Sequence, residues 1–197
     1  IDNLMDLTHL GYVHGSTIGG DPTSHNQAEL ETKRTERGAH FIRWMMNSPP
    51  PPSFVKAAGF KGSVDRWSDF EYVAPASVRQ WSGGLDEGTG ARENRDQDGG
   101  LSLRILHHAT PETDTSFHYF FSVSVEGIAV ESETGKKFFA DILEAFLEDK
   151  IYIEAQQALA TKNPDRPLIV RQHDKAVAYS RQALHQMLDA ELKQAAE

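Results

Sequence analysis

The chain contains no cysteine among its 197 residues. Without cysteine there can be no disulfide framework of the kind that stabilises small secreted domains. Such a composition is compatible with a reducing compartment, and we expect a cytoplasmic protein.

Positively charged residues are also few relative to negatively charged ones. Twenty Lys and Arg residues stand against 29 Asp and Glu residues, which gives a formal net charge of −9 at pH 7. This balance argues against a nucleic-acid or anionic-membrane partner, because either would require a basic face. No apolar run approaches the about 18 residues of a membrane helix, and no signal peptide is visible. The length suits one domain with a sizeable core.

The start of the chain is dense in groups that bind metals and protons. His9 and His14 follow two carboxylates, Asp2 and Asp6, within a mostly apolar segment. On an ideal helix the two histidines would point about 140° apart, so both could reach one ion only if the helix ends or distorts between them. We expect Gly11 to permit that distortion. Asp6 would accept the imidazole N–H of His9. Surface or core histidines remain the alternative on spacing alone.

A second candidate group lies far away in the sequence. Residues 138–157 predict an amphipathic helix whose apolar stripe comprises Phe139, Ile142, Leu143, Phe146 and Ile153. Asp149 falls on this stripe and should face the interior, whereas Glu144, Glu148 and Lys150 can face water. A buried carboxylate requires protonation, an ion pair or a metal. A buried salt bridge is one interpretation; joined to His9 and His14, Asp149 completes the set that suits non-haem Fe(II).

The remaining patterns predict a sheet. Strands are expected at residues 40–46, 66–73, 76–82, 101–107 and 116–125, with 29–37 as a solvated strand or loop, 83–100 as a polar loop and an amphipathic terminal helix from Asp174 to Leu192. Prolines 49–52 should form an extended connector that excludes a helix. Together these elements predict an α+β fold with an antiparallel sheet of six or seven strands and helices on one side.

Alternation in residues 101–107 places His107 on the same face as Leu101, Leu103 and Ile105. If that face lines a cavity, His107 is a buried donor for a substrate. A core histidine bonded to the backbone is the alternative.

Several runs carry a resemblance to a known family. The chain contains DNLMDLTHLGYVH, RWMMNSPPPP, GFKGSVDRW, HATPETDTSFHYFF and FLEDKIYIEAQQ. Over nearly its whole length it resembles the catalytic domain of Rieske non-haem iron oxygenases, above all the vanillate O-demethylase oxygenase group and dicamba O-demethylase. The resemblance implies a helix-grip (SRPBCC/START-like) fold, an antiparallel sheet that wraps a cavity and carries a long C-terminal helix.

The resemblance also implies roles for individual residues. The iron ligands would be His9, His14 and Asp149, with Asn3 near the iron and Asp6 as the carboxylate that couples it to a neighbouring subunit's Rieske centre. For substrate binding it implies His107, Gln80 and Trp81, of which His107 would help to hold a substrate carboxylate. Ala140 replaces an aromatic residue that helps to sandwich the substrate.

One departure from the family concerns its electron donor. The Rieske [2Fe–2S] cluster needs two cysteines, which this chain lacks, and the chain starts at Ile1 without a methionine. We therefore expect residues 1–197 to be the catalytic, C-terminal part of a longer oxygenase, with Fe(II) here and the [2Fe–2S] cluster on a domain outside this chain. The implied partners are a small aromatic acid, O2, a flavin or ferredoxin reductase and two further copies in a homotrimer.

The expected activity is oxidative O-demethylation of a methoxylated, vanillate-like aromatic acid. Aryl-methyl hydroxylation, N-demethylation and ring dioxygenation would use the same ligands. A helix-grip domain that binds an aromatic ligand without catalysis is a further alternative. A zinc hydrolase is disfavoured, because no base stands beside the histidines in the usual zinc pattern.

Overall fold

The computed structural model describes residues 1–167 and 169–196. Six antiparallel strands form one sheet in sequential order: β1 (Glu29–Thr35), β2 (Gly38–Ser48), β3 (Val64–Val73), β4 (Ser77–Asp86), β5 (Leu101–Pro111) and β6 (Phe117–Val125). The helices are α1 (Asp2–Met5), the 3-10 turn η1 (Leu7–His9), α2 (Leu10–Val13), α3 (Pro22–Asn26), α4 (Pro52–Ala58), α5 (Glu133–Lys162), the 3-10 turn η2 (Gln172–Asp174) and α6 (Lys175–Ala195). The predicted α+β, helix-grip architecture is confirmed.

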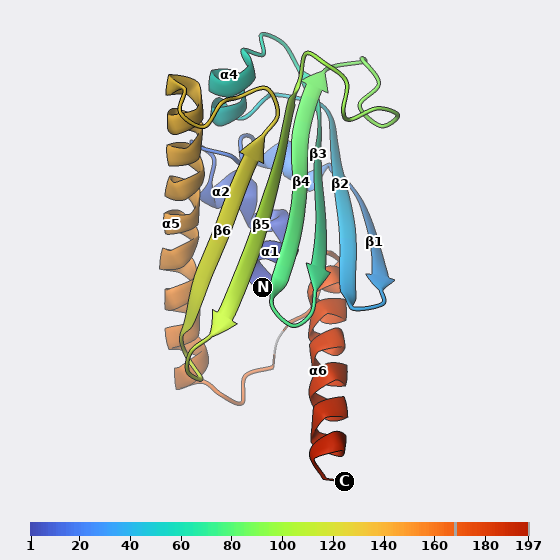
Figure 1. Cartoon of the computed structure of the whole chain (residues 1–197), viewed down its shortest axis with the longest axis vertical. Helices are drawn as coiled ribbons and strands as arrows, with labels where there is room; N and C mark the ends of the chain where they lie inside the picture. Colours follow the sequence, from blue (N-terminus) through green and yellow to red (C-terminus); the bar gives the residue numbers. More distant parts are fainter. Residues whose placement is uncertain (168, 197) are drawn as a thin grey trace.

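Two helices determine where a site can form. The 30-residue helix α5 runs alongside the sheet next to β6, while the short helices α1 and α2 lie behind the sheet (Figure 1). Helix α6 packs its first turns on β1 and β2 and then extends beyond the sheet, with Leu192 70% exposed. The expectation that the terminal helix packs on the sheet therefore holds for its first half.

The sheet is buried on both faces at its centre. On the face toward the helices, Phe41 and Phe70 stack with ring centroids 5.2 Å apart. On the other face, Trp44, Trp67 and Trp81 pack under the segment that follows β4. This two-sided burial agrees with the sequence of the strand predicted at residues 40–46, whose side chains are mostly apolar on both faces.

Several boundaries differ from the sequence-based expectations, and in two places an expected connector or loop is regular structure. Pro51 is extended and Pro52 starts α4, because a proline at the first helical position gives up no intrahelical hydrogen bond. Strand β4 continues to Asp86, so residues 83–86 are not loop. Gly83 allows this continuation: a Cβ there would lie 2.3 Å from both the Trp67 ring and the carbonyl oxygen of Leu101.

Candidate metal centre and cavity

The structure brings His9, His14 and Asp149 together from opposite ends of the chain. The Nε2 atoms of His9 and His14 lie 3.4 and 3.1 Å from Oδ1 of Asp149, and the potential ligand atoms all lie within 4.8 Å of one another. Two ligand atoms that bind one ion at right angles, each about 2.1 Å from it, stand about 3.0 Å apart. The spacing therefore fits a shared metal ion.

The outer nitrogen of each imidazole is already occupied. His9 donates from Nδ1 to the backbone carbonyl of Asp6 at 2.8 Å, and His14 donates from Nδ1 to Glu148 at 2.7 Å. A neutral ring that donates from Nδ1 presents a lone pair at Nε2. Both Nε2 atoms therefore face the carboxylate of Asp149: a protonated ring donates to it, as the raised pKa of His14 favours, and a neutral ring presents its lone pair to an ion shared with it.

The local backbone places these rings in a way that the sequence reasoning did not anticipate. The initial segment is not one helix: Asp6 is extended (φ −129°, ψ 106°) and separates α1 from η1. Gly11 lies inside α2, where its lack of a Cβ admits Pro22, whose Cα would stand 2.5 Å from a Cβ. The prediction that Gly11 is the point of distortion is therefore wrong.

Asp6 also acts differently from the prediction. Its carboxylate accepts from the backbone N–H and the hydroxyl of Thr8, both at 2.9 Å, and so caps η1. The group that orients the His9 ring is the backbone carbonyl of Asp6, not its carboxylate.

Glu148 was expected to face water and instead contacts buried His14. Burial by itself would lower the pKa of His14, but hydrogen bonds to Asp149 and Glu148 outweigh it and raise that pKa. Burial would likewise raise the pKa of Asp149, yet hydrogen bonds from His14, His9 and Asn3 hold it well below its usual range. The contact of Glu148 with His14 could have been expected from the chemistry of the site, because a buried metal-binding histidine needs a hydrogen-bond acceptor for its second nitrogen.

Asn3 joins this group through its side-chain amide, which donates to Oδ1 of Asp149 at 2.9 Å. The amide nitrogen also lies 3.4 Å from Nε2 of His9. Asn3 therefore lies beside the candidate metal centre, where the family resemblance placed it.

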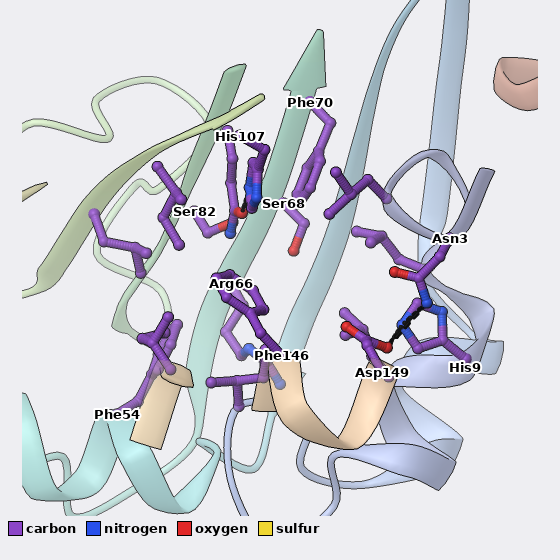
Figure 2. Close-up of a pocket in the computed structure, with 18 residues that line it drawn as sticks. Asn3, His9, Phe54, Arg66, Ser68, Phe70, Ser82, His107, Phe146 and Asp149 are labelled. Atoms are coloured by element: carbon purple, nitrogen blue, oxygen red, sulfur yellow. Dashed lines mark hydrogen bonds and ion pairs between the residues drawn. The ribbon is translucent and has the colours of Figure 1, made fainter. Parts of the chain in front are cut away.

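A cavity extends from the candidate metal centre between the sheet and α5 (Figure 2). Its walls are mostly apolar, and its polar groups come from the N-terminal segment, three strands and α5. They are Asn3, His9, Arg66, Ser68, Gln80, Ser82, His107 and Asp149. The cavity has a volume of about 60 Å³, smaller than the about 150 Å³ of an apolar cavity that binds benzene.

His107 is buried in this cavity wall, as the alternation predicted, and both of its nitrogens have partners. Nδ1 lies 2.6 Å from the hydroxyl of Tyr119, and Nε2 lies 2.8 Å from Oε1 of Gln80. The amide of Gln80 in turn donates to Ser82 at 2.9 Å. Burial lowers the pKa of His107 to about 3, so the ring is neutral at pH 7. A neutral imidazole donates from one nitrogen and accepts at the other. Because the Gln80 oxygen can only accept, Nε2 of His107 donates to Gln80 and Nδ1 accepts from the Tyr119 hydroxyl.

Two residues grouped with the substrate site lie elsewhere. Trp81 follows Gln80 in β4, so its indole lies on the opposite face of the sheet, where it packs on Trp67 with ring centroids 6.0 Å apart. Ala140 is exposed on α5, and the aromatic side chain that α5 contributes to the cavity is Phe146. The predictions that Trp81 and Ala140 stand at the substrate cavity are therefore wrong.

A second, open cavity of about 890 Å³ lies between α5 and α6 and reaches the candidate metal centre from outside. Asp6, His9 and Asp149 line it together with residues of both helices. Among the described residues, no helix is both long and apolar enough to cross a membrane.

Comparison with known proteins identifies relatives over nearly the whole chain. The family described as vanillate O-demethylase oxygenase C-terminal domain matches residues 1–190. The toluene-4-sulfonate monooxygenase system iron-sulfur subunit TsaM1 of Comamonas testosteroni is 32% identical over 192 residues, which are 97% of this chain and 55% of the relative. A vanillate O-demethylase oxygenase subunit of a Pseudomonas species is 31% identical over an alignment of 198 positions, which covers 97% of this chain and 59% of the relative.

Solved structures agree with this result. Dicamba monooxygenase bound to 3,6-dichlorosalicylic acid has a TM-score of 0.82 at 25% identity, with 97% of this chain and 55% of that chain covered. The same enzyme with non-haem iron and dicamba has a TM-score of 0.63 at 22% identity, with 98% and 55% covered, a likeness of fold alone. The chain spans little more than half the length of the relatives it matches.

Proposed function

The chain belongs to the vanillate O-demethylase oxygenase C-terminal domain family, and from this premise we propose that it is the catalytic part of a longer non-haem iron oxygenase. The proposed reaction is the O2-dependent removal of the methyl group from a methoxylated aromatic acid. The observation that carries the proposal is the convergence of His9, His14 and Asp149 beside a mostly apolar cavity.

His9, His14 and Asp149 would hold a mononuclear Fe(II). Two imidazoles and one carboxylate form the ligand set that suits this ion and leaves positions open for other ligands. The ion would supply the O2 and one-electron chemistry that side chains lack.

The chain's own residues organise the site around that ion. Glu148 and the carbonyl of Asp6 fix the two imidazole rings, and the Asn3 amide holds the carboxylate of Asp149. Apolar side chains of β5 and α5 would surround the aromatic ring and exclude water. The hydrogen-bonded His107, Gln80 and Ser82 would form a polar wall against which a ligand is oriented.

We propose that electrons come from a Rieske [2Fe–2S] centre outside this chain, supplied by a flavin or ferredoxin reductase, within a homotrimer. Asp6 would connect the iron to this Rieske centre. It lines the open cavity between α5 and α6, and its backbone carbonyl accepts the hydrogen bond of the candidate ligand His9.

The test uses the full-length protein that carries this chain, loaded anaerobically with Fe(II). Because the [2Fe–2S] cluster contributes two irons, we expect a third iron per chain in the wild type and in a His118→Ala control, whose side chain is exposed, and loss of that third iron in His9→Ala. With a reductase and vanillate, the wild type should release formaldehyde. Absence of iron beyond the cluster in all three proteins would contradict the proposal.

A second candidate reaction is hydroxylation of an aryl methyl group. It is supported by the 32% identical relative, which belongs to a toluene-4-sulfonate monooxygenase system. Product analysis separates the two: a benzylic alcohol from toluene-4-sulfonate without formaldehyde from vanillate would favour this candidate.

A further inference from the structure

Arg66 of β3 is a buried cation that pairs with no carboxylate of the described residues. Its side chain is 3% exposed and lines the cavity, in which Figure 2 shows it between β3 and the segment of α5 that carries Phe146. Nη1 donates to the carbonyl of Gly19 at 3.3 Å, and Nε has no acceptor. Within residues 1–167 and 169–196, no carboxylate forms an ion pair with this guanidinium.

Burial of an unpaired charge costs desolvation free energy, which the packing of neighbouring side chains does not offset. Burial, with a smaller contribution from the neighbouring cation Arg43, lowers the pKa of Arg66 to about 9, so the group is charged at pH 7. Asp149 shares the cavity, but its hydrogen bonds go to Asn3 and the two histidines. No carboxylate in the described part of the chain therefore balances the charge of Arg66.

The other candidate for recognising an anion is His107, and its chemistry is less suitable. It is neutral, and its N–H points to Gln80 while its second nitrogen accepts from Tyr119. A ligand could take a hydrogen bond from His107 only by displacing one of these partners. Arg66 has free N–H groups and the opposite charge to an acid.

We propose that Arg66 binds the anionic group, a carboxylate or a sulfonate, of the aromatic ligand that enters this cavity. The proposal rests on the proposed function, for which it names the residue that recognises the acid group of the substrate. The ring of Phe54, 5.3 Å from Cζ of Arg66, limits the directions that the guanidinium can take and keeps it at the apolar wall.

The competing explanation is that Arg66 only anchors the Gly19 carbonyl, which also accepts from His25 at 2.8 Å. The two roles predict different ligand selectivity. An anchor would affect charged and neutral ligands alike, whereas an anion-binding residue distinguishes them.

Calorimetric titration of the full-length protein tests this with 4-methoxybenzoate, 4-methoxybenzenesulfonate and the neutral 4-methoxybenzamide. We expect the wild type to bind at least one of the anions roughly tenfold or more tightly than the amide, and the better anion identifies the group recognised. Arg66→Gln should remove this preference and leave amide binding within about threefold. Arg79→Gln, an exposed arginine on the neighbouring strand, should behave like the wild type.

Two results would overturn the proposal: no preference for either anion in the wild type, or an equal loss for all three ligands in a folded Arg66→Gln protein. If Arg66→Gln does not fold, Arg66→Lys replaces it, because lysine retains the charge but lacks the planar guanidinium. Its anion preference should fall while amide binding stays within about threefold, and an unchanged preference or an equal loss for all three ligands would overturn the proposal.

Iron analysis of the same samples separates this result from the oxygenase proposal. One iron per chain beyond the [2Fe–2S] cluster, without anion preference, would refute the role of Arg66 and leave the proposed function intact. Anion preference without iron beyond the cluster would refute the proposed function and leave the role of Arg66 intact.

Discussion

His14 donates a hydrogen bond from Nδ1 to the carboxylate of Glu148, 2.7 Å away, and Glu148 directly precedes Asp149 in α5. One turn of α5 thus provides both a candidate metal ligand and the acceptor that orients another. Because His14 is fully buried, this acceptor has no substitute in solvent.

We predict that Glu148→Gln weakens Fe(II) binding by about tenfold and Glu148→Ala by up to about 100-fold, since such acceptors orient the ligand and raise its basicity. Competition with a chelator under anaerobic conditions measures the affinity. Glu144→Gln, an exposed carboxylate on the same helix, is the matched control and should bind as the wild type does. Wild-type affinity in Glu148→Ala would show that the contact has no role in metal binding.

Asp6 offers a pair of variants that separates structure from catalysis. Asparagine can accept the Thr8 N–H as aspartate does, so Asp6→Asn should keep η1 and the iron but lower turnover at least about tenfold through loss of charge. Asp6→Ala removes the cap and should lose iron as well. Iron content and turnover of the full-length variants are the measurements, and full turnover in Asp6→Asn would exclude a role for the carboxylate.

His107 should make the fold sensitive to acid. An unfolded histidine titrates near 6.5, whereas burial lowers the pKa of His107 to about 3 in the folded protein. Between these pH values the unfolded state binds more protons, so the free energy of unfolding falls as the pH drops below about 6.5.

His107→Gln can still donate to Gln80 and accept from Tyr119 but does not titrate. We predict that its urea midpoint changes less than that of the wild type between pH 7 and pH 5. Equal shifts in the two proteins would place the acid sensitivity at other groups, such as His25, whose pKa burial lowers to about 4.

Gly83 is required by close packing. Gly83→Ala would place Cβ against the Trp67 ring and the Leu101 carbonyl, and we predict a loss of about 2–3 kcal/mol in the free energy of unfolding. Gly62→Ala, with nothing within 4 Å of its Cβ position, should change stability by less than about 0.5 kcal/mol. Chemical denaturation compares the two, and equal stabilities would mean that β4 can shift away from Trp67.

Local periodicity was sufficient for much of the fold. The apolar stripe of residues 138–157 placed Asp149 inward, and the alternation in β5 placed His107 on the buried face. The same alternation, applied to β4, would have placed Trp81 opposite Gln80, since neighbours in a strand face different ways. That error arose from the resemblance and not from the pattern.

The sequence by itself determined which residue types were available and which side of its element each would occupy. Tertiary structure decided which of them meet: that Glu148 reaches His14, that the backbone of Asp6 orients His9, and that Arg66 is buried without an acid. Periodicity describes a side chain relative to its own helix or strand, whereas the hydrogen bonds of His14 to Glu148 and of Asn3 to Asp149 join groups more than a hundred residues apart, which only packing brings within 3 Å.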